Sequence, residues 1–158
     1  MELALIFPAM MVAFFGTYEI TQLVRVYMNL GLSSAVVADL LARNSPDTPG
    51  EITDACNGGK MIMLPFVGTN FNAAVASVTN KSGTITLNWS NTTSCGTGAA
   101  AIASPTTLAA TLVPNAGDSV IIVQTNYSYT ALTSFVLNQT YTISHLGYAR
   151  PRLPGGAS

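Results

Sequence analysis

Few residues in this 158-residue chain belong to the types that carry out chemistry. Cys56 and Cys95 are the two cysteines, and they could be free buried thiols or one disulfide. His145 is the single histidine and no CxxC pair is present, so a tetrahedral metal site has too few ligands. We therefore expect no metal and no cofactor. In a chain with the composition of an exported protein, a Cys56–Cys95 disulfide is favoured over two thiols.

The other reactive side chains form no recognisable catalytic pattern. His145 falls within a predicted strand, where we expect an ordinary strand side chain. The stretch Asn57-Gly58-Gly59-Lys60 lacks the spacing of a phosphate-binding loop and is typical of a turn. The carboxylates are dispersed along the chain, at Glu2, Glu19, Asp39, Asp47, Glu51, Asp54 and Asp118. We therefore expect that the protein is not an enzyme.

Charge is scarce in this sequence. Charged residues make up 8% of the chain, whereas they make up about 25% of an average globular protein. Hydrophobic residues account for 49%, so Thr, Ser, Asn and Gly replace the missing charge. Such neutral polar surfaces are typical of secreted β proteins. The net charge is −1 and the basic residues form no cluster, so we expect no nucleic-acid partner.

The segment from Leu3 to Tyr18 contains no charged residue. As a helix it would span about 24 Å, somewhat less than the ~30 Å of a hydrocarbon core. Three interpretations are open: a cleaved signal peptide, a membrane anchor, and a helix that lies first in lipid and later in a protein bundle. The signal peptide is disfavoured, because its basic region is not seen and no small-residue cleavage motif follows Gly16.

Glu2 stands at the very start of this apolar run. An acidic residue there could simply favour a helix start, because it interacts well with the helix dipole. It could instead pair with the terminal amine of a neighbouring chain during assembly. A carboxylate at the bilayer centre costs about 3 kcal/mol or more, but one near the boundary costs less.

The segment that follows has the pattern of an amphipathic helix. Its apolar residues recur mostly at steps of three and four, at Ile20, Leu23, Val24, Tyr27, Leu30, Val37, Leu40 and Leu41. We expect this stripe to pack on the rest of the protein. Asn44-Ser45-Pro46 and Pro49-Gly50 end the helix. One helix from near Met1 to about Arg43 is therefore predicted, with a kink rather than an end at Pro8.

The remaining residues have a β-rich pattern. A short helix or turn carrying Cys56 is expected over residues 51–64. Alternating residues over 74–79 and 83–89 predict a hairpin. Residues 99–110 could be a short helix or an irregular cover, and long strands are expected over 119–129 and 137–148. The fold class is therefore α+β with a mainly antiparallel sheet, divided into an N-terminal membrane and assembly helix (1–43) and a globular head (44–158).

Motifs along most of the chain share the features of one known family. The opening, Met1-Glu2-Leu3-Ala4-Leu5-Ile6-Phe7-Pro8, has a Glu, an apolar run and an early Pro. Later motifs are Met63-Leu64-Pro65-Phe66, Thr86-Leu87-Asn88-Trp89-Ser90, Val123-Gln124-Thr125-Asn126-Tyr127-Ser128-Tyr129-Thr130 and Tyr148-Ala149-Arg150-Pro151-Arg152. In this combination the chain resembles the TadE/TadG-like pilins of the tight-adherence branch of type IV pili.

This resemblance implies a pilin-like fold and a subunit, major or minor, of an extracellular adhesive filament. The implied partners are other pilin copies, the inner membrane before assembly, a prepilin peptidase and the Tad-type assembly machinery. In such proteins a basic leader precedes the apolar segment and is removed. No leader is seen before Glu2, so either processing is unusual or the first residues are missing from this sequence. A monomeric membrane-anchored surface-binding protein is the alternative function, and a periplasmic enzyme on an anchor is a third.

In the filament hypothesis the N-terminal helices of many copies form a bundle, and the heads face solvent. A helix that is apolar on all sides needs lipid or protein around its whole circumference. Small residues allow helices to approach closely, and Glu2 would find an amine or a backbone donor inside the bundle. The expected assembly residues are Glu2, Ala4, Phe7, Pro8, Ala9, Ala13 and Gly16.

Overall fold

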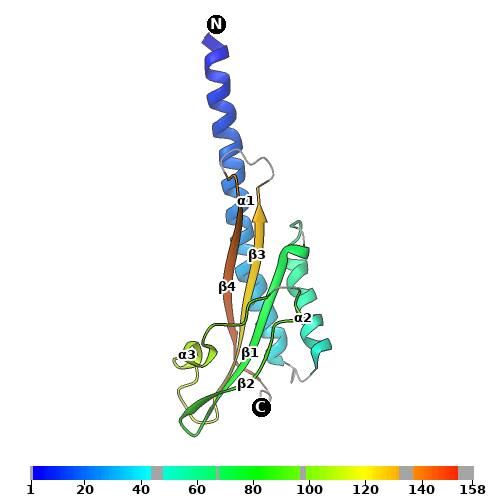
Figure 1. The fold of residues 1–158 in the computed structure, drawn as a ribbon, viewed down its shortest axis with the longest axis vertical. Coiled ribbons are helices and arrows are strands. Elements are labelled where there is room, and N and C mark those ends of the chain that lie inside the picture. The colour runs from blue at the N-terminus through cyan, green and yellow to red at the C-terminus, as the bar shows by residue number, and fades with distance from the viewer. Residues whose placement is uncertain (1, 44–47, 67, 97–98, 132–136, 153–158) are drawn as a thin grey trace.

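The structure, a computed structural model, describes residues 2–43, 48–66, 68–96, 99–131 and 137–152, with the side chains of residues 2–5 left out. A long helix extends well beyond a small sheet and accounts for the elongated shape of the molecule (Figure 1). The sheet has four strands, and all of its pairings are antiparallel. The predicted α+β class is therefore confirmed.

Helix α1 (Glu2–Arg43) is continuous over 42 residues, which corresponds to about 63 Å. Pro8 lies inside the helix and does not end it, as expected. The N-terminal part of α1 stands clear of the sheet, whereas the C-terminal part runs along it (Figure 1). The N-terminal part of α1 therefore projects from the head, and its C-terminal part forms one layer of the head.

The side of α1 that meets the sheet differs from the predicted stripe. Leu30 and Leu41 are buried as expected, but Ile20, Val24 and Tyr27 are about half exposed. Small residues fill much of the contact instead, because the sheet backbone comes very close to the helix. These buried small residues are Ser34, Ala38 and Ala42, whereas the buried Ser33 faces α2. The amphipathic prediction was therefore right about packing but wrong about half of the residues involved.

Helix α2 (Pro49–Ile62) realises the helical alternative for the connecting segment. The turn expected at Asn57-Gly58-Gly59-Lys60 was wrong, because these residues lie inside the helix. It begins where Thr48 Oγ1 accepts a hydrogen bond from the Glu51 N–H at 3.4 Å, a typical helix cap. It packs closely on α1, since the Ser33 hydroxyl donates to the Gly59 carbonyl at 3.0 Å. A Cβ atom at Gly59 would overlap side chains of α1. Helix α2 therefore covers the C-terminal half of α1 and holds Cys56 against it.

The sheet is built from β1 (Phe71–Lys81), β2 (Thr84–Asn91), β3 (Ser119–Thr130) and β4 (Thr140–Ala149), in the order β2-β1-β3-β4. A short helical turn (Gly68–Asn70) leads into β1. Strands β1 and β2 form the predicted hairpin. Its two turn residues, Ser82 and Gly83, have φ angles of 54° and 92°, as the turns that suit the twist of a hairpin require.

The face of the sheet that points away from α1 is covered by irregular chain and by α3 (Pro105–Ala109). Residues 99–110 were expected to form a short helix or an irregular cover. The structure shows both, because the short helix α3 lies within an otherwise irregular segment. A second apolar core lies beneath it, formed by Ala74, Ala76, Val78, Ile102, Ala109, Val113, Val120 and Ile122. The sheet is therefore buried on both faces over its lower half, which fits the many apolar residues of β1 and β3.

Strand β4 runs beside α1 in the same direction along the long axis of the molecule (Figure 1). The closest contact is at Gly147, which is buried against the backbone of Ser34. After the strand, the Arg152 N–H donates to the Ala42 carbonyl at 3.0 Å, and the Arg152 guanidinium lies 2.9 Å from an Asp39 carboxylate oxygen. The Arg-Pro-Arg ending therefore attaches the end of the sheet to the end of the helix.

Replacing Gly147 with Ala should lower the free energy of unfolding by about 1–3 kcal/mol. An added Cβ would overlap the carbonyl of Ser34, which belongs to the helix backbone and cannot rotate away. Urea unfolding of the full chain in detergent, followed by the fluorescence of the single tryptophan, Trp89, measures the change. Gly50→Ala is the matched control, because its Cβ would meet no atom closer than 4.0 Å. Equal midpoints for Gly147→Ala and wild type would contradict the close contact.

Candidate assembly and membrane surface

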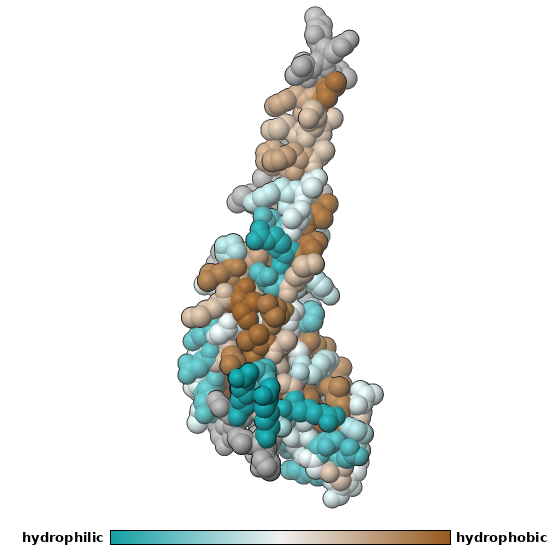
Figure 2. Space-filling model, turned by 180° about the vertical axis from the view of Figure 1, so that it is seen from behind, coloured by the Kyte–Doolittle hydropathy of each residue, from teal (hydrophilic) through white to brown (hydrophobic). Residues whose placement is uncertain are grey.

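The N-terminal end of α1 exposes a continuous apolar surface. We call residues 2–15 the projecting segment. Within it, every side chain from Ile6 to Phe14 is exposed, and every one of them is apolar. Figure 2 shows brown and pale colours along this part, with teal only farther down, beside the head. Exposed apolar surface of this kind marks a site of contact with protein or membrane.

Helix α1 is long and apolar enough to cross a membrane, judged by its length and composition. Phe7 is 58% exposed and Phe14 is 67% exposed, so the head does not cover them. The core helix of a soluble protein would bury such side chains. The projecting segment instead leaves them available to lipid or to other chains.

Small residues follow one side of the projecting segment. Ala9 and Ala13 are four residues apart, and Gly16 lies three residues farther on, so helical spacing places them on a common face. Ala9 and Ala13 are exposed, whereas Gly16 is buried at the level where the head begins. This face therefore leaves room for the backbone of another helix at two of its three positions.

The structure places the predicted assembly residues as follows. Phe7, Pro8, Ala9 and Ala13 are brought together on the exposed projecting segment. Glu2 and Ala4 belong to the first turns of α1 by their backbone, and their side chains lie outside the described part of the structure.

Glu19 marks the junction between the projecting segment and the head. Its side chain is only 1% exposed. Its Oε2 atom accepts a hydrogen bond from the Leu137 N–H at 2.8 Å. Strand β4 begins at Thr140 and not at the predicted Leu137. The Leu137 amide is instead bonded to a side chain of α1.

In the sequence Glu19 was one of several dispersed carboxylates, and its burial was not predicted. The signal that could have revealed it is a lone carboxylate between two apolar stretches, since a buried charge needs an internal partner. Tyr129 is buried in the same region. Burial raises the pKa of Tyr129, and the negative charge of Glu19 raises it further. The junction thus combines a carboxylate, an amide and a phenol inside the head.

An apolar hollow of about 510 Å³ lies where α1 meets β4. Its lining contains no charged residue and consists of Leu23, Val24, Tyr27, Tyr141, Thr142 and Ile143. Because these residues continue the exposed side of α1 below the projecting segment, the apolar surface of the helix extends onto the head.

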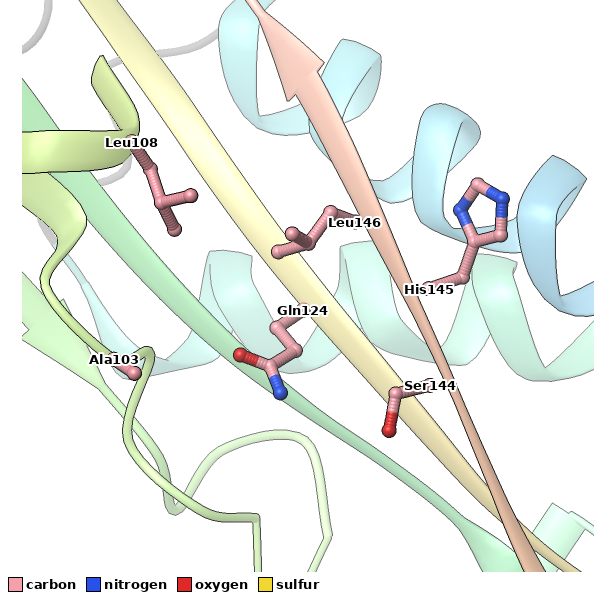
Figure 3. Close-up of a pocket in the computed structure, with 6 residues that line it drawn as sticks. All are labelled: Ala103, Leu108, Gln124, Ser144, His145 and Leu146. Atoms are coloured by element: carbon pink, nitrogen blue, oxygen red, sulfur yellow. The ribbon is translucent and has the colours of Figure 1, made fainter. Parts of the chain in front are cut away.

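A second hollow of about 460 Å³ lies on the other face of the sheet, beneath the cover that carries α3 (Figure 3). Gln124, Ser144 and Leu146 point toward this hollow, whereas the ring of His145 points toward α1. The Ser34 hydroxyl donates to the Gly31 carbonyl at 2.8 Å, so the His145 Nδ1–H donates to Ser34 Oγ at 3.2 Å. His145 is therefore part of the contact between strand and helix.

The predicted Cys56–Cys95 disulfide is present, with the two Cα atoms 5.5 Å apart. It joins α2 to the loop that follows β2, and both cysteines are 1% exposed. A disulfide of this kind is typical of a domain outside the cytoplasm. Among the residues whose placement is described, no three His, Cys, Asp or Glu side chains gather as a metal site would require.

A long apolar N-terminal helix packed on a four-stranded antiparallel sheet is a pilin-like architecture. Comparisons with protein-family models, with curated proteins and with solved structures found no match for this chain.

Proposed function

We propose that this protein is a structural subunit of an extracellular filament of the type IV or tight-adherence kind. The observation that carries the proposal is the projecting segment, which is apolar and exposed over consecutive residues from Ile6 to Phe14. The C-terminal half of α1 already packs on the sheet. One head therefore cannot enclose the projecting segment of its own chain, and outside a membrane only other copies can cover it.

Before assembly, the projecting segment lies in the inner membrane and the head lies outside the cytoplasm. The length of α1 and the buried disulfide support this location. A prepilin peptidase and the Tad-type machinery are the partners that the sequence resemblance implies for maturation and assembly. The role proposed for the chain is structural and adhesive, and it includes neither catalysis nor nucleic-acid binding.

Electron microscopy of sheared cell-surface material tests the proposal. We expect filaments, and we expect mass spectrometry of the purified filaments to identify this chain as a component. The control is a strain without the chain, in which these filaments should be lost. Recovery of the chain from the inner membrane alone, with no filaments at the surface, would contradict the proposal and favour a monomeric membrane-anchored binding protein.

A further inference from the structure

The position of the Glu19 carboxylate bears on how deeply α1 could enter a membrane. In the sequence, Glu19 interrupts the apolar run after Tyr18 and leaves an uncharged stretch of about 24 Å, which is shorter than a hydrocarbon core of about 30 Å. A carboxylate on the outer surface of the helix would place the membrane boundary at this residue. A carboxylate turned away from that surface would leave the boundary free to lie farther along the helix.

The structure places the carboxylate inside the head. Glu19 is 1% exposed and accepts the Leu137 N–H at 2.8 Å. Gly16, three residues earlier on the helix, and Tyr129 of β3 are buried as well. The head therefore covers the side of α1 that carries the charge and leaves the opposite side free.

The free side of α1 stays uncharged beyond Glu19. Ile20 and Val24 are 53% and 45% exposed. The hydroxyls that interrupt the apolar surface are bonded within the helix, since Thr17 donates to the Ala13 carbonyl and Thr21 to the Thr17 carbonyl, each at 2.7 Å. A bonded hydroxyl costs little in an apolar environment. The exposed surface thus carries no charge until Arg25.

The length of this extended surface matches a bilayer. From Leu3 to Val24 the chain has 22 residues, or about 33 Å of helix, which covers a hydrocarbon core of about 30 Å. Tyr27, 54% exposed, and Arg25 follow directly. Exposed tyrosines are frequent at membrane interfaces, and a long basic side chain can reach the headgroups from there.

We propose that lipid contact continues past Glu19 to Val24 on the exposed side of α1, so that the upper end of the head sits in the membrane interface. This presupposes the membrane residence proposed above. The apolar hollow beside Val24 and Tyr27 continues the same surface, and its lining has no charge. The exposed head residues that follow Leu137 are polar and uncharged, as the headgroup layer favours: Asn138, Gln139 and Thr140. The Leu137 N–H satisfies the Glu19 carboxylate inside the head, away from the exposed side of α1, which lets an acidic residue lie at membrane depth.

Thiol labelling in vesicles locates the boundary. The full chain, with its disulfide intact, is reconstituted at low protein density in vesicles of phosphatidylcholine and phosphatidylglycerol, with one added cysteine per variant. A membrane-impermeant maleimide is supplied on both sides, and rates are normalised to those of the urea-denatured protein. We expect Phe14→Cys and Ile20→Cys to react at least tenfold more slowly than Met28→Cys. These positions are 67%, 53% and 66% exposed in the protein itself, so the head does not account for the protection.

Each other outcome has a distinct meaning. If Ile20→Cys reacts as fast as Met28→Cys while Phe14→Cys stays protected, the boundary lies at Tyr18 and the extended contact is wrong, although the anchor stands. Protection of Ile20→Cys only at high protein density would assign this surface to a second copy of the chain and also overturn the proposal. Rapid labelling of Phe14→Cys would contradict membrane residence itself.

A charge exchange tests the role of Glu19 directly. The Glu19→Gln/Ile20→Glu variant keeps the net charge but moves the carboxylate by one residue to the exposed side. We expect a Thr17→Cys thiol to react about tenfold faster in this background than in wild type, because the boundary shifts toward the N-terminus. Glu19→Gln alone is the matched control, because its amide oxygen can still accept the Leu137 N–H, and Thr17→Cys should remain protected in it. Equal protection in the exchanged variant would refute the proposed shielding.

Discussion

The free energy of unfolding of a Cys56→Ala/Cys95→Ala variant is expected to be about 4 kcal/mol lower than that of wild type. The bond joins two residues with a sequence separation of 39. Closing a loop of this length lowers the conformational entropy of the unfolded chain. Two hydrogen bonds lie beside it: the Ala73 N–H donates to the Cys95 carbonyl at 3.2 Å, and the Thr53 hydroxyl donates to the Ser94 carbonyl at 3.3 Å. Without the covalent bond, hydrogen bonds of this kind and the packing of Cys95 in the core would have to hold the loop after β2 to its neighbours.

The measurement is urea unfolding of the full chain in detergent, followed by Trp89 fluorescence. Alanine at both positions avoids leaving one unpaired thiol, which could form bonds between chains. Wild type under reducing conditions is the second comparison and should show a loss similar to that of the variant. A loss of less than 1 kcal/mol in both samples would mean that the disulfide adds little to the stability of the head.

Ala9→Trp and Ala13→Trp are expected to reduce the yield of filaments at least about tenfold, since overpacking a helix contact costs about 1–3 kcal/mol and every subunit repeats that contact. Both alanines are exposed in the single chain, so the substitutions should leave the head folded. Sheared filaments are quantified against the membrane-bound pool by immunoblotting. Ala9→Ser, which keeps the side chain small, is the matched control and should assemble normally.

Glu2→Leu extends the same experiment to the start of the helix. If the carboxylate pairs with an amine or a backbone donor of a neighbouring copy, the variant should insert into the membrane but enter filaments less well. A carboxylate that only favours the helix start would have little effect on assembly. Normal filament yields for Glu2→Leu and for both tryptophan variants would mean that the helix is an anchor alone.

Much of the fold was predictable because its signals are local. The uninterrupted apolar run indicated a long helix, and the alternation around Asn80–Gly83 indicated the hairpin. The buried side of α1 was not predictable in the same way. Apolar residues occur on most sides of this helix, so periodicity could not show which side meets the sheet. The contact at Gly147 selects Ser34 and its small neighbours, and that choice depends on tertiary packing.

The candidate site was predicted in part for a related reason. Exposed apolar residues such as Phe7 could be identified from the sequence. A helical segment without charged residues is apolar on all sides, so any side that the head does not cover exposes apolar side chains. The burial of Glu19 left a signal in the sequence, but its bond to the backbone amide of Leu137, 118 residues away, did not. Every residue except proline has a backbone N–H, so the sequence does not show which N–H will bind a carboxylate. The partner of a buried carboxylate therefore cannot be identified by sequence when that partner is a backbone N–H.

Strand β4 and α1 lie side by side and run in the same direction, and this arrangement has a mechanical consequence. In the proposed adhesive filament, tension would reach each head through α1. The strands lie along the direction of that pull (Figure 1), while the hydrogen bonds between them lie across it. Force would then act on the β3–β4 pairing in shear, along ten paired positions at once. Such a head should resist extension far better than one whose strands could be peeled apart one bond at a time.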